Sequence, residues 1–307
     1  MKNAVIYSGL IVALAACFVL CSGCTSDENS MTTPGGNVQA VSYSLSEEGI
    51  LNVESVGYSY SLGNVTNAGA DDGVKVSEVL MTDGETEVYA LLAEPGNEDP
   101  KAGIVFAPGA GVSADSHLNR SIEYAESDIA FMIVDVRGNG GKTPGVVLNF
   151  QNEFNMAVAG KTPQYYSIIF DLIAAKDYLK ELYGEDFPVY VMGSSNGGRY
   201  AAIAAAVDSG FAGYFGVSTS GYEYEEGING QDVDLFMKSV DPDTYIAEIS
   251  PAKTVIFHAP DDDIIGYDYG LAFFNQASEP KDFVAFNGTH GINGEVDDYV
   301  KNMLAAN

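Results

Sequence analysis

Apolar runs and helical stretches alternate along most of the chain. Short runs rich in β-branched and aromatic residues, each bounded by Gly, Pro, Asn or Asp, are typical of buried strands. Because such strands alternate here with helical stretches, the pattern predicts an α/β protein whose mainly parallel sheet carries helices on both faces. The strands expected from this pattern lie near residues 102–107, 130–136, 187–192, 211–218, 252–258 and 282–286.

Further strands are expected ahead of this set. Residues 74–81 and 85–92 are split by the turn Thr82-Asp83-Gly84, which predicts a hairpin. Polar–apolar alternation between residues 41 and 63 predicts strands at the sheet edge. The clearest helix is expected from about residue 162 to residue 183. Its apolar residues on one face are Ile168, Leu172, Ala175, Leu179 and Leu182.

The first 24 residues differ in kind from the rest. Met1-Lys2-Asn3 precedes an apolar run, and the segment ends in Cys21-Ser22-Gly23-Cys24. A single basic residue, an apolar centre and small residues before a cleavage site are typical of a signal peptide. The Ser-Gly-Cys ending resembles a lipobox, which implies cleavage before Cys24 and a diacylglyceryl group on its thiol. An ordinary signal peptide and an uncleaved N-terminal anchor are the alternatives.

The chain is accordingly expected to have three parts. Residues 1–23 would be a lipoprotein-type signal peptide, residues 24–40 a flexible polar tether, and residues 41–307 a single folded domain. A lipid on Cys24 would anchor the protein to an extracytoplasmic membrane face without a spanning helix. All three cysteines lie in the first 24 residues, so the folded domain must be held by its core without disulfides.

A Gly-x-Ser-x-Gly pattern is formed by Gly193-Ser194-Ser195-Asn196-Gly197. It follows the strand expected at 187–192 and precedes the small-residue helical stretch 198–206. A strand, a tight turn and a helix are the setting of a nucleophile elbow, where a strained turn exposes a serine hydroxyl beside a helix N-terminus. We therefore predict that Ser195 is a nucleophile.

A serine hydroxyl needs a base to take its proton, and the usual base is histidine. Among the three histidines, His117 precedes Ser195, whereas serine hydrolases with this kind of elbow place their histidine last. His258 is expected to be structural, at the end of a strand. His290 lies in a Gly-flanked loop after the last expected strand and is the predicted base.

The acid that orients His290 is expected on the loop after the preceding strand. Three consecutive carboxylates, Asp261, Asp262 and Asp263, satisfy this position. Since like charges repel, at most one of them is expected to point at the histidine. We choose Asp262, with Asp261 as the second candidate and Asp263 as the third.

The chain resembles the α/β-hydrolase superfamily, and most closely its dienelactone-hydrolase and acyl-esterase branch. The resemblance covers about residues 74–307. The stretch from His258 to Ile265 is similar to the His-Gly-x-x-Asp-x-x-Val segment of that branch, which implies that Asp262 is the acid. The loop around His290 is similar to the branch's histidine loop. The resemblance implies an α/β-hydrolase fold in one domain with a small cap-region insertion, and chemistry without a metal or organic cofactor.

An oxyanion hole requires backbone N–H groups that point at the developing charge. The amide of Asn196, directly after the nucleophile, would be the first donor. The exit loop Pro108-Gly109-Ala110-Gly111 resembles the family's His-Gly-x-Gly loop, which implies Ala110 as the second donor. Its neighbours Gly109 and Gly111 are the alternatives.

Other residues near the expected site are predicted to support it. The segment from Phe131 to Gly140 resembles the family's fourth strand and its Asp-x-Arg-Gly-x-Gly exit, so Asp135 and Arg137 are expected to be scaffold. Arg199 is expected to form a structural ion pair with a carboxylate. Two insertions, 143–164 and 222–249, would either pack as ordinary loops or wall an acyl pocket.

The charge of the chain limits its partners. Lys and Arg number 14 against 43 Asp and Glu, a formal net charge of −29, which argues strongly against nucleic acid as a partner. The residues taken together predict a serine hydrolase that cleaves a small carboxylic ester through an acyl-enzyme. The alternatives are a peptidase or amidase, an acyltransferase, and a non-catalytic lipid-anchored binding protein, which would carry a spoiled triad.

The lipid anchor gives a first testable prediction. The mature protein is expected to begin at Cys24 and to carry the mass of a diacylglyceryl group. Because the thioether forms on the cysteine thiol, Cys24→Ser is expected to lose the lipid and to leave the membrane fraction. Intact-protein mass spectrometry of both proteins checks this, and a mature wild-type mass without the diacylglyceryl group would reject the anchor.

Overall fold

The computed structural model describes residues 41–70 and 73–306. The predicted signal peptide and tether, with Cys24, lie outside the described residues, and so does the start of the mature chain. None of the helices in the described ranges combines the length and apolar character that a membrane crossing requires.

The strands follow the order of the chain. They are β1 (Ser42–Leu45), β2 (Leu51–Ser55), β3 (Ser59–Ala68), β4 (Val74–Thr82), β5 (Glu87–Pro95), β6 (Ala102–Ala107), β7 (Ile129–Val134), β8 (Val189–Ser194), β9 (Gly213–Val217), β10 (Lys253–His258) and β11 (Lys281–Ala285).

The α-helices lie between and after these strands. They are α1 (Leu118–Ala125), α2 (Phe150–Val158), α3 (Gln164–Tyr183), α4 (Asn196–Val207), α5 (Gln231–Val240), α6 (Tyr267–Gln276) and α7 (Gly294–Ala305). Three short 3-10 helices accompany them, namely η2 (Ala114–His117), η3 (Pro242–Thr244) and η4 (Ile246–Ile249).

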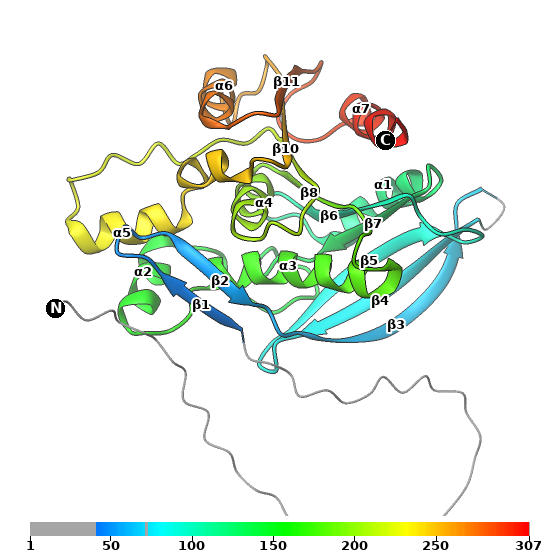
Figure 1. Ribbon diagram of the computed structural model, residues 1–307, viewed down its shortest axis with the longest axis horizontal. Coiled ribbons are helices and arrows are strands. Elements are labelled where there is room, and N and C mark those ends of the chain that lie inside the picture. The colour runs from blue at the N-terminus through cyan, green and yellow to red at the C-terminus, as the bar shows by residue number, and fades with distance from the viewer. Residues whose placement is uncertain (1–40, 71–72, 307) are drawn as a thin grey trace, which may run out of the picture.

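Nine strands of the described ranges form the central sheet, in the order β11-β10-β9-β8-β6-β7-β5-β4-β3 (Figure 1). Strands β6 to β11 pair in parallel, whereas β5, β4 and β3 join antiparallel at one edge. The predicted strands and the predicted hairpin of β4 and β5 are present, with ends within a few residues of the expected ones. The mainly parallel sheet predicted from the sequence is therefore confirmed.

The earliest strands depart in part from the prediction. Strand β3 lies at the sheet edge as expected, but β1 and β2 form a separate two-stranded antiparallel sheet. Leu51 of β2 is buried in the same apolar core as α3 and α4. Apolar alternation identified strands here without identifying their partners, because pairing depends on contacts that are distant in the sequence.

An apolar core lies on each face of the sheet. Strand β6 shows why, since Val105 and Ala107 belong to the core under α3 and α4, while Ile104 and Phe106 belong to the core under α1 and α7. Side chains alternate between the faces of a strand, so a strand covered on both faces is apolar throughout. The loops at the carboxyl ends of β6, β8 and β9 then meet at one edge of the sheet.

Helix α3 is more deeply buried than its predicted single apolar face required. Ile168, Leu172, Ala175 and Leu179 are buried as expected, but so are residues on its other sides. Leu182, predicted to face the core, is instead 46% exposed. It lies in the last turn of the helix, where the chain leaves the protein interior at Gly184.

A buried ion pair joins the exit of β7 to the middle of α3. Arg137 donates from Nε to Asp171 Oδ2 over 2.7 Å and from Nη2 to Asp171 Oδ1 over 2.9 Å. The Tyr58 hydroxyl donates to the same carboxylate, and Asp83 accepts a further bond from Arg137. Arg137 is 7% exposed and Asp171 1% exposed. The predicted scaffold role of Arg137 is thus seen in its contacts.

Removal of this carboxylate should destabilise the fold. Asp171→Ala leaves the buried Arg137 guanidinium with a single carboxylate partner, so we expect the free energy of unfolding to fall by about 3–5 kcal/mol. Denaturant titration measures the change. Asp186→Ala removes an exposed carboxylate and serves as the control, with an expected change within about 0.5 kcal/mol. Equal stability of the two variants would contradict the role assigned to the pair.

Candidate active site

Ser195 occupies a strained turn between β8 and α4. Its φ of 56° and ψ of −123° lie outside the conformations that non-glycine residues normally adopt. The Ser195 amide donates to the carbonyl of Val217 over 2.9 Å, and Thr219 donates from its hydroxyl to the Ser195 carbonyl. Both bonds come from the end of β9, so the neighbouring strand holds the turn in its strained form.

Two glycines of the Gly-x-Ser-x-Gly pattern are required by close backbone contacts. A Cβ at Gly197 would lie 2.0 Å from the carbonyl oxygen of Ala107, and a Cβ at Gly193 would lie 2.2 Å from the carbonyl oxygen of Gly197. No side chain fits at either distance. The pattern therefore marks a turn packed tightly against the end of β6, as a nucleophile elbow requires.

The structure brings His290 and Asp262 together. His290 Nδ1 lies 3.0 Å from both Oδ1 and Oδ2 of Asp262. A carboxylate accepts hydrogen bonds, so the proton is on Nδ1 and the Nε2 lone pair is left as an acceptor. The flanking Asp261 and Asp263 are exposed, and neither is bonded to His290.

The Asp262 carboxylate is fixed by the loop that follows β10. The amides of Ile264 and Ile265 donate to Asp262 Oδ1 over 3.0 and 2.9 Å. Burial acts to raise the pKa of Asp262, but these two N–H groups and His290 together hold its pKa below the ordinary value. The carboxylate is therefore kept ionised beside the histidine.

His258, the last residue of β10, fixes the same loop. It is fully buried, and its Nε2–H donates to the Ile265 carbonyl over 2.7 Å. The other ring nitrogen faces Gly270, where a Cβ would lie 2.1 Å from it. His258 thus has the structural place predicted for it. His117 contacts Arg120 and packs edge-on against Phe106, so it too lies in a structural setting.

The loop that carries His290 is held from the end of β9. The hydroxyl of Ser218 accepts the amide N–H of Gly291 over 3.0 Å. Ser218 is fully buried and has a φ of 47°, a second strained residue at this edge of the sheet. Sequence reasoning missed Ser218, since no local pattern links it to a loop more than seventy residues later.

The loop after β6, predicted to supply an oxyanion donor, lies directly against Ser195. A Cβ at Gly109 would be 3.3 Å from the Ser195 Cβ. Asn139 pins this loop, because its side chain donates to the carbonyls of Gly109 and Val112 and accepts from the Gly111 amide. Asn139 stands in the Asp-x-Arg-Gly-x-Gly exit, so the sequence signal for it was present.

Asp135, the other predicted scaffold residue, supports the same loop. Its carboxylate accepts the amides of Ala114 and Thr143 over 3.0 and 2.7 Å. In contrast, the amide N–H groups of Asn196 and Ala110 donate to no acceptor within the described part of the chain. Two free amides beside a strained serine form a surface on which an oxyanion could rest.

The Ser195 hydroxyl forms no hydrogen bond with His290 among the described residues. In serine hydrolases without substrate this bond is often long and tightens only when the substrate is bound. Ser195 and His290 are each partly exposed, and His290 has 22% of its side chain exposed. Asp262, the predicted acid, is buried.

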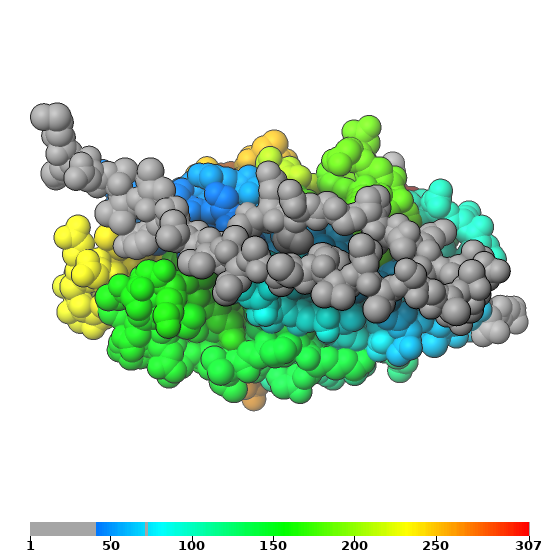
Figure 2. All heavy atoms as spheres, turned by 90° about the horizontal axis from the view of Figure 1, so that it is seen from below, coloured from blue at the N-terminus to red at the C-terminus, as the bar shows by residue number. Residues whose placement is uncertain are grey.

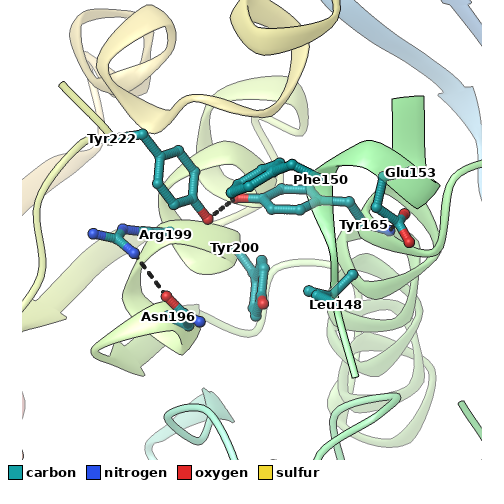
Figure 3. Close-up of a pocket in the computed structure, with 8 residues that line it drawn as sticks. All are labelled: Leu148, Phe150, Glu153, Tyr165, Asn196, Arg199, Tyr200 and Tyr222. Atoms are coloured by element: carbon teal, nitrogen blue, oxygen red, sulfur yellow. Dashed lines mark hydrogen bonds between the residues drawn. The ribbon is translucent and has the colours of Figure 1, made fainter. Parts of the chain in front are cut away.

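A pocket of about 190 Å³ is lined in part by Asn196, the residue that follows Ser195 (Figure 3). Four of its lining residues are aromatic, and each comes from a different segment of the chain. The first insertion supplies Leu148, Phe150 and Glu153, the start of α3 supplies Tyr165, α4 supplies Asn196, Arg199 and Tyr200, and the second insertion supplies Tyr222. Both insertions therefore wall a pocket, as one of the two sequence alternatives proposed.

The two insertions also support each other. The rings of Phe154 in α2 and Phe236 in α5 lie 5.7 Å apart. Figure 2 shows the green surface of the α2 segment beside the yellow surface of the α5 segment, in agreement with Figure 1. The walls of the pocket are thus joined outside it by apolar packing.

Arg199 differs from its prediction. In the described residues it forms no ion pair with a carboxylate. Its guanidinium donates to the carbonyls of Ser220 and Gly221 and to the Asn196 side chain, and it lies 4.2 Å from the centre of the Tyr222 ring. The expectation rested on the excess of acids, but the acceptors within reach of Arg199 are the Asn196 side-chain oxygen and backbone carbonyls of the loop after β9.

Comparison with solved structures agrees with this architecture. Acetyl xylan esterase 1 from a Thermoanaerobacterium species aligns with a TM-score of 0.66 at 16% identity, covering 80% of this chain and 87% of its own. The acetyl xylan esterase from Paenibacillus sp. R4 aligns with a TM-score of 0.66 at 18% identity, covering 80% and 88%. The chain has the α/β-hydrolase fold. The predicted fold class is thereby confirmed.

A glucuronoyl esterase from Solibacter usitatus aligns less closely. Its TM-score is 0.60 at 12% identity, and the alignment covers 81% of this chain and 86% of that one. No protein-family model matches the chain, and no curated protein matches it in sequence. At these identities the likeness is one of fold, and the chemistry has to be argued from the site.

The Asp262 environment predicts a pH dependence of stability. Hydrogen bonds favour the folded carboxylate, so its folded pKa lies below the ordinary value of 3.8. A depressed pKa contributes stability that is present above the unfolded value and is lost as the pH falls through the folded value. The stability advantage of the wild type over Asp262→Asn is therefore expected at about pH 5 and should shrink towards about pH 2.

Urea titrations of both proteins across this range measure the effect. Asp263→Asn removes an exposed carboxylate from the same loop and is the matched control. An advantage over Asp262→Asn that grows on acidification would show that the buried carboxylate destabilises the fold.

Proposed function

We propose that the protein is a serine hydrolase that cleaves carboxylic esters through Ser195, His290 and Asp262. The observation that carries the proposal is the buried Asp262 carboxylate bonded to His290 Nδ1. The histidine loop is bonded through Gly291 to Ser218, the residue after the Val217 that holds the strained Ser195 turn. A carboxylate that fixes a histidine tautomer leaves Nε2 as a proton acceptor, which is the arrangement serine activation requires.

In the first half of the reaction the Ser195 oxygen forms a bond to the ester carbonyl carbon while its proton passes to His290 Nε2. The negative charge on the carbonyl oxygen rests on the amides of Asn196 and Ala110. The bond from carbon to the alcohol oxygen then breaks, and His290 returns its proton to that oxygen. The alcohol leaves, and an acyl-enzyme remains on Ser195.

In the second half water replaces the alcohol. His290 Nε2 takes a proton from the water as its oxygen bonds to the acyl carbon. The bond to Ser195 breaks, and the proton returns from His290 to the serine oxygen. Asp262 stays ionised throughout and stabilises the imidazolium. The carboxylic acid leaves, and the site is restored.

The choice of an ester as substrate is supported by the structural neighbours. The names of the aligned proteins from Thermoanaerobacterium, Paenibacillus and Solibacter describe ester hydrolases. Esters also need less activation of the leaving group than amides. An exported enzyme held at the membrane by a lipid on Cys24 is the setting that the N-terminal sequence supports.

The triad can be tested with a fluorophosphonate probe and with 4-nitrophenyl acetate as substrate. Wild-type protein is expected to be labelled at Ser195, and Ser195→Ala is expected to lose the label and about 10⁶-fold of kcat. Asp262→Asn is expected to lose about 10⁴-fold, because the histidine tautomer is no longer fixed. Peptide mapping of the adduct identifies the labelled residue.

Two neighbouring carboxylates provide matched controls. Asp261→Asn and Asp263→Asn change exposed acids on either side of Asp262 and are expected to keep rates close to wild type. A loss in either of them equal to that in Asp262→Asn would assign the acid elsewhere. Absence of label on Ser195 in the folded wild-type protein would reject the hydrolase proposal.

A further inference from the structure

Half of the residues that line the pocket beside Asn196 are aromatic. Tyr222 and Phe150 meet edge to face at 4.9 Å, and Tyr165 and Tyr200 meet edge to face at 5.0 Å. Phe150 also stacks on Tyr165 at 6.4 Å, so the four rings form one continuous aromatic cluster. A cluster that presents both ring edges and ring faces is suited to pack against a further flat aromatic ring.

Most polar groups in this pocket are already bonded within the protein. The hydroxyls of Tyr165 and Tyr222 are bonded to each other at 3.1 Å. Arg199 donates to carbonyls, and Glu153 accepts the amide of Tyr165 at the start of α3. These bonds hold the walls of the pocket in place.

Tyr200 is the exception. It is 3% exposed, and within the described residues its hydroxyl has no hydrogen-bond partner. In the view of Figure 3 this hydroxyl lies between Asn196 and Leu148, at the border of the pocket. Burial raises the pKa of Tyr200, so the hydroxyl stays protonated and is both a donor and an acceptor. The hydroxyl oxygen is not among the fully buried unpaired atoms of the described residues, so it is accessible at the pocket and free to bond to a ligand.

The position of the pocket indicates which part of an ester would enter it. The alcohol oxygen of an ester must face His290, because it takes its proton from that residue. Neither Ser195 nor His290 lines the pocket, whereas Asn196, whose amide would bind the carbonyl oxygen, does. The pocket therefore lies on the side of the carbonyl group, and the acyl part of the ester is the part assigned to it.

We infer that the acyl group is a hydroxylated aromatic ring, of the 4-hydroxybenzoyl or 4-hydroxycinnamoyl class, with its phenol hydrogen-bonded to Tyr200. This inference rests on the proposed ester hydrolase function. A protein cavity of about 150 Å³ admits benzene, so the volume of about 190 Å³ accommodates one ring and a small substituent.

Other acyl and sugar groups fit the pocket less well. An acetyl group would leave most of the volume empty, and an aliphatic chain would leave the Tyr200 hydroxyl unpaired. A sugar ring carries hydroxyls on most of its carbons, whereas half of the eight lining residues present aromatic surface. The aromatic walls and the Tyr200 hydroxyl together favour the phenolic ring.

A panel of methyl esters with one leaving group tests the inference. We expect kcat/KM for methyl 4-hydroxycinnamate or methyl 4-hydroxybenzoate to exceed that for methyl butyrate by roughly tenfold or more. The matching ester without the hydroxyl is expected to react roughly tenfold more slowly, because Tyr200 loses its partner. Tyr200→Phe is expected to reduce this tenfold ratio to about one.

Tyr60→Phe is the matched control, since it removes a tyrosine hydroxyl from β3 that donates to the Ala174 carbonyl away from the pocket. It should keep the tenfold ratio. The inference is overturned if methyl butyrate or an acetylated xyloside is hydrolysed as well as the phenolic esters, or if Tyr200→Phe leaves the ratio unchanged.

A binding measurement separates this inference from the proposed function. Calorimetry of methyl 4-hydroxycinnamate with Ser195→Ala is expected to show binding that Tyr200→Phe, added to the same variant, weakens roughly tenfold. Binding without hydrolysis of any ester by the wild type would reject the function and keep the aromatic site. Hydrolysis of aliphatic esters without this binding would reject the aromatic site and keep the function.

Discussion

The close approach of the Ser195 turn to the end of β6 is the constraint on which the site depends. Gly197 comes so near the Ala107 carbonyl that no side chain fits between them. The strained φ of Ser195 is maintained because β9 bonds the turn from the other side through Val217. A single residue is thus placed by three parallel strands at once, which is a more rigid support than a loop could give.

The remaining site loops are held by polar side chains from neighbouring strand ends. Asn139 holds the loop after β6, Ser218 holds the loop that carries His290, and His258 holds the loop that carries Asp262. Each of these bonds joins a side chain to a backbone group. Since backbone groups are present whatever the residue, this support constrains the path of the loops and leaves their exposed side chains free to vary.

The sequence was informative where the physical requirement is local. Buried strands need apolar runs and the elbow needs glycines, while the preference for Asp262 among three acids was implied by the resemblance of its segment to that of the hydrolase branch. It was uninformative where the partner is distant. The pairing of β1 with β2, the exposure of Leu182 and the carbonyl partners of Arg199 depend on packing between segments far apart in the chain. The bond between Ser218 and the Gly291 amide also joins segments that are far apart in the chain.

In the proposed function, one set of residues acts on the carbonyl and another selects the acyl group. The two sets lie on different parts of the fold. Ser195 and Asp262 stand at or just beyond the ends of strands, which the fold fixes, while Phe150 and Tyr222 come from two insertions. Solved structures with 12–18% identity keep the same fold, so the strand ends can persist while nearly every side chain changes. The insertions are not bound by the sheet in this way. In the proposed function, substrate choice is therefore assigned to the aromatic pocket, separately from the strained turn of Ser195.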